Sequence, residues 1–405
     1  MTAFDVIVIG AGPAGAAAAF TAARGGLSVA LIDKARFPRE KLCGGGLTGR
    51  SYSYFAQIYG TPVPAALIET KTAVTFHAFG QELARINDMP AMHMAMRRSF
   101  DDDMYRRAVA GGAVDFTGSR IAALDVDQPC VTLGDGTRLT ARVLIGADGV
   151  NSQVARALFG ASHDRTRVGF GLEVEAPAAP DNLTAPLRID FGAAEWGYGW
   201  HFPKSGSSTI GIGGVLSRNP DLKTAMSAYL AQLGHDPAMP CKGHFLPFGD
   251  FRRRAGRRAV LLAGDAAGLV DPITGEGIAY AMKSGQLAAQ AAIEALAAGQ
   301  ADRALHLYQQ KLRPIHKALR QARRLRQLIF APVFQASFVR AFRGSGTLRH
   351  LYLRLLAGEI EYDQVARATL RRLPRVLGQV VARRLSPLLR RERPEPRNGT
   401  RDRPH

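Results

Sequence analysis

Three glycines and an aspartate near the start of the chain have the types and spacing that dinucleotide binding requires. Gly10, Gly12 and Gly15 follow an apolar run, residues 4–9, and precede an alanine-rich segment. Gly10 permits a tight turn, Gly12 lets the backbone approach a pyrophosphate, and Gly15 lets a helix pack closely on a strand. A second apolar run ends at Asp33, on the order of 20 residues after the glycines, where a carboxylate can bind both ribose hydroxyls. The pattern predicts a strand–helix–strand unit that holds a nucleotide.

Two further strand-like runs end in an acid. Residues 142–147 lead to Asp148, and residues 259–264 lead to Asp265. Ligands of an open α/β sheet gather at the carboxyl ends of its strands, so both acids are expected near the nucleotide. Asp265 can accept a ribityl hydroxyl or order water at a phosphate. A glycine-rich turn follows and opens a helix, expected at about residues 276–298, whose first N–H groups would face an anionic or carbonyl group.

The glycine motif begins the chain, which favours FAD because its long body can then lie across the whole domain. A loop over residues 35–48 contains Cys43 and then three glycines, a sign of backbone held close to something flat or charged. With a nucleotide bound upstream, the flavin ring is the candidate. Cys43 is then either a ring contact and proton source or a small buried thiol that only packs. Arg97, ahead of a helix expected to reach about Ala110, is either a ligand of the cofactor's phosphates or a surface arginine.

Large aromatic residues alternate with other residues between positions 196 and 202. In a strand they would share one face, because side chains alternate between the two faces. They then form either the wall of an apolar tunnel that faces the flavin or an ordinary aromatic core strand. His201 would point to the other face and is expected to be structural. The aromatic residues are Trp196, Tyr198, Trp200 and Phe202.

These segments together resemble the para-hydroxybenzoate-hydroxylase-like flavoproteins and, within them, the geranylgeranyl reductase family. The similarity covers about residues 4–300 and rests on the glycine motif with residues 39–46, 146–149, 198–204, 264–265 and 271–278. It implies non-covalent FAD and the reduction of isoprenoid double bonds in a lipid or tetrapyrrole tail. Asp33 stands where the family often has glutamate, and a ribose contact survives this change. By the family pattern, FAD would contact Gly15, Asp33, Cys43, Gly44, Gly46, Arg97, Asp265, Gly277 and Ile278, and the motifs above add Gly10, Gly12, Ala14 and Asp148.

The predicted fold is α/β, with a Rossmann-like FAD-binding domain of the para-hydroxybenzoate-hydroxylase type. Strand-like runs over residues 155–255 alternate with Pro and Gly turns, which indicates an inserted antiparallel β-sheet domain for the substrate. A helical region is expected at the C-terminus. The predicted segments are 1–75, 96–155 and 256–300 for FAD, 76–95 and 156–255 for the substrate, 301–390 for the basic helices and 391–405 for a disordered tail.

The chemistry that the resemblance implies is demanding, since an isolated trisubstituted alkene is a poor hydride acceptor. A reductase must hold the double bond over reduced flavin, exclude water and supply a proton. Cys43 and Tyr198 are the candidate proton donors. No second GxGxxG motif follows a strand-like run, as a nicotinamide site would require, so the electron donor is either NAD(P)H or a ferredoxin. Two other functions stay open: an FAD-dependent monooxygenase or halogenase of the same fold, and a non-catalytic carrier of prenyl chains.

Positive charge is concentrated at the C-terminal end of the chain. The formal net charge is +19, and residues 303–405 hold 24 Lys and Arg against six Asp and Glu. Such asymmetry indicates an acidic partner surface. No nucleic-acid recognition motif accompanies the arginines, so nucleic acid is not expected. An anionic membrane suits a helix that mixes leucine, aromatic residues and arginine. The alternatives are a solvated basic face and a helical cap on the substrate domain.

Cysteine usage and hydropathy indicate the compartment. Cys43, Cys130 and Cys241 are widely spaced and odd in number, which argues against a disulfide framework or a zinc site and for a reducing compartment. No signal peptide is expected, because the first apolar run is itself read as a strand. No apolar run approaches the roughly 18 residues of a membrane span. We therefore expect a cytoplasmic protein that associates with the inner face of the membrane.

Overall fold

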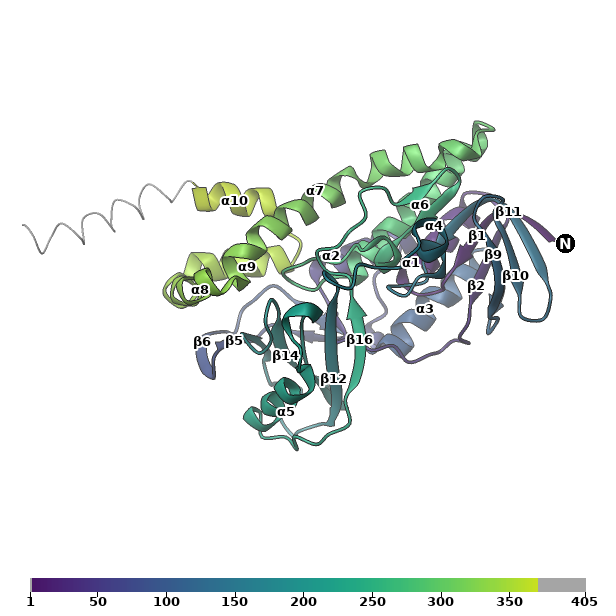
Figure 1. Cartoon of the computed structure of the whole chain (residues 1–405). Coiled ribbons are helices and arrows are strands. Elements are labelled where there is room, and N and C mark those ends of the chain that lie inside the picture. The colour runs from purple at the N-terminus through teal and green to yellow at the C-terminus, as the bar shows by residue number, and fades with distance from the viewer. Residues whose placement is uncertain (1, 371–405) are drawn as a thin grey trace, which may run out of the picture. The chain divides into compact units, whose positions relative to one another are not determined.

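The computed structural model describes residues 2–370 of the 405-residue chain. The chain forms two compact units. The first unit spans Met1–Ile360 and the second spans Glu361–His405. The first unit holds three β-sheets with their helices (Figure 1). In the second unit, the described helix is α10 (Tyr362–Leu370). Residues 371–390 of the predicted helical region and the predicted tail, 391–405, lie outside the described residues.

The largest sheet has eight strands and a parallel centre. The C-terminal halves of its central strands are continuous apolar runs, as expected for segments that are buried on both faces. β9 and β10 join it through antiparallel pairs. The order along the sheet is β17 (Gly256–Arg257), β18 (Val260–Leu262), β11 (Arg138–Gly146), β1 (Thr2–Ile9), β2 (Val29–Asp33) and β8 (Val114–Thr117), with β10 (Cys130–Leu133) beside β11 and β9 (Ile121–Asp125) beside β10.

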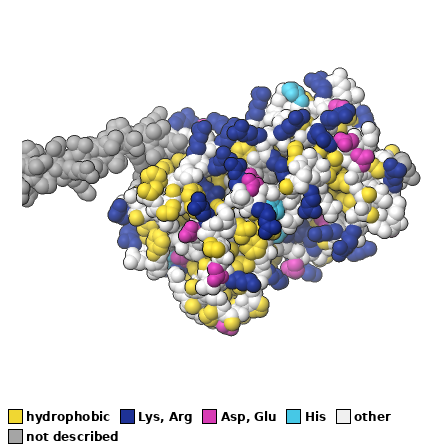
Figure 2. All heavy atoms as spheres, viewed as in Figure 1, with side chains coloured by type: hydrophobic (Ala, Val, Ile, Leu, Met, Phe, Trp, Pro, Cys, Tyr) yellow, Lys and Arg dark blue, Asp and Glu magenta, His cyan; other side chains and the backbone are white. Residues whose placement is uncertain are grey.

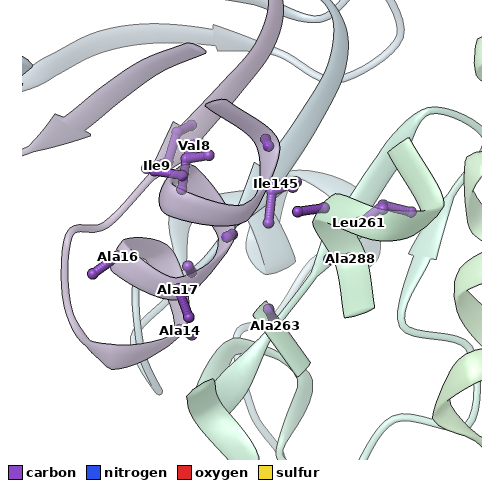
Figure 3. Close-up of a cluster of buried hydrophobic side chains, with 14 of the residues drawn as sticks. Val8, Ile9, Ala14, Ala16, Ala17, Ile145, Leu261, Ala263 and Ala288 are labelled. Atoms are coloured by element: carbon purple, nitrogen blue, oxygen red, sulfur yellow. The ribbon is translucent and has the colours of Figure 1, made fainter. Parts of the chain in front are cut away.

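Two alanine-rich helices, α1 (Pro13–Arg24) and α6 (Ile278–Ala297), pack closely beside this sheet. Their small side chains meet Val8, Ile145 and Leu261 of three neighbouring strands (Figure 3). Larger residues would separate the helices, since a Cβ atom at Gly285 would lie 2.0 Å from the Ala14 carbonyl oxygen. Other helices of this part of the chain are α2 (Gly49–Tyr59), α3 (Arg97–Ala110), α4 (Gln153–Phe159), and the 3₁₀ helices η1 (Ala65–Leu67), η3 (Gly264–Ala267) and η4 (Ala301–Arg303).

The second sheet has seven strands and is antiparallel except for the parallel pair of β5 and β13. Helix α5 (Leu222–Gln232) covers one of its faces, where it packs on Leu172, Val174, Ile210 and Ile212. The strand order is β16 (Lys242–Leu246), β12 (Gly169–Pro177), β15 (Ser207–Val215), β14 (Tyr198–Pro203), β13 (Leu187–Phe191), β5 (Val74–Ala78) and β6 (Gln81–Ile86), with η2 (Leu216–Arg218) after β15.

The C-terminal helices of the first unit cover part of the opposite face of this sheet. Phe76 and Phe191 pack edge-on against Phe342 of α8 (Pro332–Gly344) and Tyr352 of α9 (Gly346–Leu356). The long helix α7 (Ala304–Phe330) leads to them (Figure 1). A small third sheet joins β3 (Gly46–Leu47), β7 (Met92–Met94) and β4 (Glu69–Lys71). Within residues 2–370, no helix is both long and apolar enough to cross a bilayer.

Candidate cofactor and substrate site

One cavity of about 640 Å³ is lined by residues of both large sheets. The strand ends and helix starts of the first sheet form its polar part, and the open face of the second sheet forms its apolar part. Gly15 is absent from the lining, because it packs under the glycine turn. The other predicted cofactor residues all line the cavity: Gly10, Gly12, Ala14, Asp33, Cys43, Gly44, Gly46, Arg97, Asp148, Asp265, Gly277 and Ile278.

The glycine turn between β1 and α1 leaves no room for side chains. Gly10 has φ +97°, and a Cβ atom there would lie 2.3 Å from the Ala147 carbonyl oxygen. A Cβ atom at Gly15 would lie 1.6 Å from the Gly10 carbonyl oxygen. The first turn of α1 therefore sits directly on the turn, and its free N–H groups point into the cavity mouth.

Arg39 lies at this helix N-terminus, and the sequence did not single it out as a ligand. Its Nη2 atom would be 3.3 Å from a Cβ at Gly12 and is 3.1 Å from Asp101 Oδ2. Its Nη1 atom is buried and has no hydrogen-bond partner among the described residues. Buried guanidinium nitrogens are normally satisfied, so an acceptor at this place is missing. The pyrophosphate of FAD supplies such an acceptor, and the residues present fit the cofactor.

Arg97 also lines the cavity and binds the same Asp101 oxygen as Arg39, but it lies beside Cys43. Its Nε and Nη2 atoms each donate to Asp101 at 2.7 Å. Burial by itself would lower the pKa of Arg97, but the Asp101 carboxylate and the neighbouring Cys43 sulfur outweigh it and raise the pKa. The guanidinium is thus held by Asp101 against Cys43, while Arg39 is the arginine at the glycine turn.

The three strand-end acids are in different environments. Asp33 accepts from Ala11 N and Ala35 N, both at 2.8 Å, which leaves lone pairs for a ribose. Asp148 accepts from Ser152 Oγ at 2.5 Å and from Gln153 N at 2.7 Å, so it caps α4. Burial raises the pKa of Asp148 and that of Asp265. At the cavity wall, Asp148 is therefore held by the start of α4, and Asp33 is held by two backbone N–H groups.

A buried network connects the loop of Cys43 to the start of α6. Arg50 Nη1 lies 2.9 Å from Glu276 Oε2 and donates to the Tyr280 hydroxyl at 2.8 Å. Thr48 donates to the other oxygen of Glu276. The network holds the N-terminus of α6 at the cavity, where its partial positive charge faces the lining residues Gly277 and Ile278.

The aromatic wall is shorter than the spacing suggests. Tyr198, Trp200 and Phe202 lie on β14 and line the cavity, but Trp196 does not. Trp196 precedes the strand with φ +54°, and Arg326 donates to its carbonyl at 2.8 Å. The two-residue period of a strand therefore ends before it reaches Trp196. Gly44 lies directly against this wall, since a Cβ there would be 3.1 Å from Phe202.

A stripe of glycines makes room for Trp200, a feature that the sequence analysis missed. A Cβ atom at Gly211 would lie 2.4 Å from the Trp200 ring, and Cβ atoms at Gly213 and Gly171 would lie 3.4 and 3.7 Å from it. The signal was present as glycines at period two in two neighbouring strands. Other lining residues that were not predicted include Glu173, Ile189, His244, Leu246, Phe330, Tyr352 and Leu356.

The remaining predictions concern Tyr198, Cys43 and His201. The Tyr198 hydroxyl donates to the Thr274 carbonyl at 2.5 Å, and burial raises the pKa of Tyr198. Cys43 Sγ accepts from Gly45 N at 3.5 Å. His201 points away from the cavity toward His235, and burial lowers the pKa of His201 to about 4. The structure thus brings Tyr198 and Cys43 to the cavity and keeps His201 out of it.

Known proteins are similar to this chain in sequence and in fold. The protein-family profile described as "Lycopene cyclase protein" matches residues 5–374. The menaquinone reductase of Mycobacterium tuberculosis is 35% identical over 310 residues, which cover 71% of this chain and 76% of the relative. The geranylgeranyl diphosphate reductase of Rhodobacter capsulatus is 31% identical over 314 residues, 73% of this chain and 76% of the relative.

A solved structure has a similar architecture. The geranylgeranyl bacteriochlorophyll reductase-like protein of Thermoplasma acidophilum superposes with a TM-score of 0.68 at 20% identity. The match covers 94% of this chain and 99% of that chain. The fold class that the sequence predicted is confirmed.

Proposed function

The chain belongs to the lycopene cyclase protein family and is a geranylgeranyl-reductase-like FAD oxidoreductase, and from this we propose that it saturates double bonds of a prenyl chain. The prenyl chain would be carried by a lipid, a quinone or a chlorophyll-type substrate. NAD(P)H or a ferredoxin would supply the electrons.

The observation that carries the proposal is the continuity of the cavity. Its polar end has the residues for FAD, and its apolar end is lined by Trp200, Phe330 and Leu356. An alkene offers no polar group for recognition, so shape and apolar contact must position it. When bound and reduced, FAD supplies the hydride. The chain contributes positioning and the exclusion of water, with Gly44 bringing the backbone against the aromatic wall.

The function is tested by single-turnover oxidation of the reduced protein. The purified protein is reduced with dithionite under anaerobic conditions and mixed separately with geranylgeranyl diphosphate, a geranylgeranyl phospholipid and menaquinone. We expect the absorbance of oxidised flavin to return with one of them, and the prenyl chain of the product, not a quinone ring, to gain two hydrogen atoms per step. A flavin that ignores every prenyl compound but consumes oxygen with NAD(P)H would favour the monooxygenase or halogenase. A protein that purifies colourless would favour the carrier.

The proposed partner is an anionic membrane, and the protein surface that would contact it lies at the junction of α7 and α8. Leu328, Val333 and Phe334 are 50%, 78% and 45% exposed, and exposed arginines flank them at positions 323, 324, 340 and 343. Figure 2 shows basic and hydrophobic side chains together over this region. Neighbouring Phe330 lines the apolar end of the cavity. A prenyl chain could therefore pass from a bilayer to the site without crossing water.

Introducing charge into this surface should weaken membrane binding. For the double variant Val333→Glu/Phe334→Glu, we expect binding to anionic phosphatidylglycerol vesicles to fall at least about tenfold, because each apolar side chain contributes roughly 1.5–3 kcal/mol on full burial. Co-sedimentation measures the change. Leu183→Glu, at a residue that is 66% exposed elsewhere, is the matched control and should bind as the wild type does. Equal binding by the double variant would rule out this surface.

A further inference from the structure

Glu173 places a carboxyl group in the apolar part of the cavity. It lies on β12, where Leu172 and Val174 point to the core under α5. Side chains alternate along a strand, so Glu173 points to the opposite face, where it lines the cavity and is only 5% exposed. A carboxyl group in such a wall is costly to bury and would not be expected for packing alone.

The surroundings of Glu173 bring its pKa close to neutral pH. Burial raises the pKa of Glu173 to about 7, although Lys41 lowers it. Burial in turn lowers the pKa of the Lys41 amine. The Trp200 indole N–H also lies beside the carboxyl. The other titratable groups around it are Glu175 on β12, Lys204 after β14, Tyr198 on β14, His244 on β16 and Cys43 in the glycine loop.

A polar cluster on the same face of the sheet reaches solvent. Glu175, two residues along β12, has a side chain that is 43% exposed and lies 2.8 Å from Lys204 Nζ. Thr209 donates to Glu175 Oε2 at 2.8 Å and bonds to Lys204 as well. Successive residues on one face of a strand are about 7 Å apart. Glu173 thus lies between the apolar part of the cavity and a cluster that reaches solvent, from which its proton can be replaced.

Each of the two donors expected from the sequence lies against another polar group of the chain. The Tyr198 O–H is committed to the Thr274 carbonyl. Cys43 lies beside the Arg97 guanidinium. Glu173 is the carboxyl group that combines a place in the apolar wall with a neighbouring polar cluster.

We propose that Glu173 is the acid that protonates the alkene in this cavity. The role rests on the proposed function. One alkene carbon gains a hydride from reduced flavin and the other gains the Glu173 proton, so the double bond becomes a single bond with two new C–H bonds. The flavin is thereby oxidised by two electrons. The Glu173 carboxylate then takes a proton from the side of Glu175.

The test compares Glu173→Gln with the wild type in the single-turnover assay between about pH 5 and pH 9. We expect the wild-type rate to fall about tenfold per pH unit above about 7, as the carboxyl group ionises. The Glu173→Gln variant should react at least about 100-fold more slowly at low pH and lose this pH dependence. Glu82→Gln, on edge strand β6 of the same sheet, is the matched control and should keep the wild-type rate and profile.

Infrared spectroscopy of the oxidised holoprotein gives a second readout that needs no turnover. The wild type should show a protonated carboxyl C=O band that disappears with a midpoint of about 7, and Glu173→Gln should lack it. If Glu173→Gln does not retain FAD, Glu173→Asp replaces it and should keep a pH-dependent rate with a moved midpoint.

The proposal is overturned if Glu173→Gln keeps the wild-type rate and profile, or if no carboxyl of the wild type titrates near neutral pH. A wild type that no prenyl compound reoxidises would overturn the proposed function itself, and with it this role. Failure of the Glu173 role can therefore be distinguished from failure of the proposed function.

Discussion

A Gly15→Ala variant should purify without FAD. A Cβ atom at this position would lie 1.6 Å from the Gly10 carbonyl oxygen, so α1 would have to move off the end of β1. That movement displaces the helix N–H groups away from Arg39, which stays bound to Asp101, and so separates the two parts of the pyrophosphate site. We expect FAD affinity to fall by more than about 100-fold, as each tenfold loss needs only about 1.4 kcal/mol. The flavin-to-protein absorbance ratio and a fluorescence titration with FAD measure the loss.

Gly206→Ala is the control for this variant. Gly206 lies in a turn of the second sheet, and a Cβ atom there would meet nothing within 4 Å. It should therefore retain the full amount of FAD. A yellow Gly15→Ala protein with the wild-type flavin content would show that the contact is relieved without moving the helix.

An Asp101→Asn variant should lose about 3–5 kcal/mol of unfolding free energy. Asp101 is fully buried, binds Arg97 through two bonds of 2.7 Å and lies 3.1 Å from Arg39. Removing one charge of a buried ionic cluster leaves the others uncompensated, which is the source of the expected loss. FAD binding should weaken as well, because Arg39 loses the carboxylate that orients it. Urea unfolding of the FAD-free protein separates the two effects.

The neighbouring residue provides the comparison. Asp102 bonds to Arg106 at 2.7 Å, but the arginine is exposed to solvent. Ion pairs of that kind contribute about 0–1 kcal/mol. Asp102→Asn should therefore unfold close to the wild type, and an Asp101→Asn variant no less stable than it would contradict the role given to the buried cluster.

Sequence alone was sufficient to bring together most residues of the polar half of the cavity. The glycine turn, the helix after it and Asp33 are close together along the chain, so their geometry follows from local backbone sterics and from the spacing itself. Asp148 and Asp265 could be added to the predicted site because each follows a strand, and the carboxyl ends of parallel strands meet at one edge of a sheet. Twelve of the thirteen residues predicted for the cofactor line the cavity, and Gly15 packs beneath it.

The substrate half was decided by tertiary structure. Whether Glu173 meets Trp200 depends on strand pairing between distant parts of the chain. Glu173 of β12 pairs with Gly211 of β15, and Gly211 pairs with Trp200 of β14. A shift of one residue in that register would have turned Glu173 toward α5. Trp196 also could not be placed from the sequence. It keeps the two-residue spacing of the aromatic residues, but its backbone lies outside the strand. Arg39 and the C-terminal helices likewise reach the cavity only through folding, since no local pattern encodes which distant surface a side chain will meet.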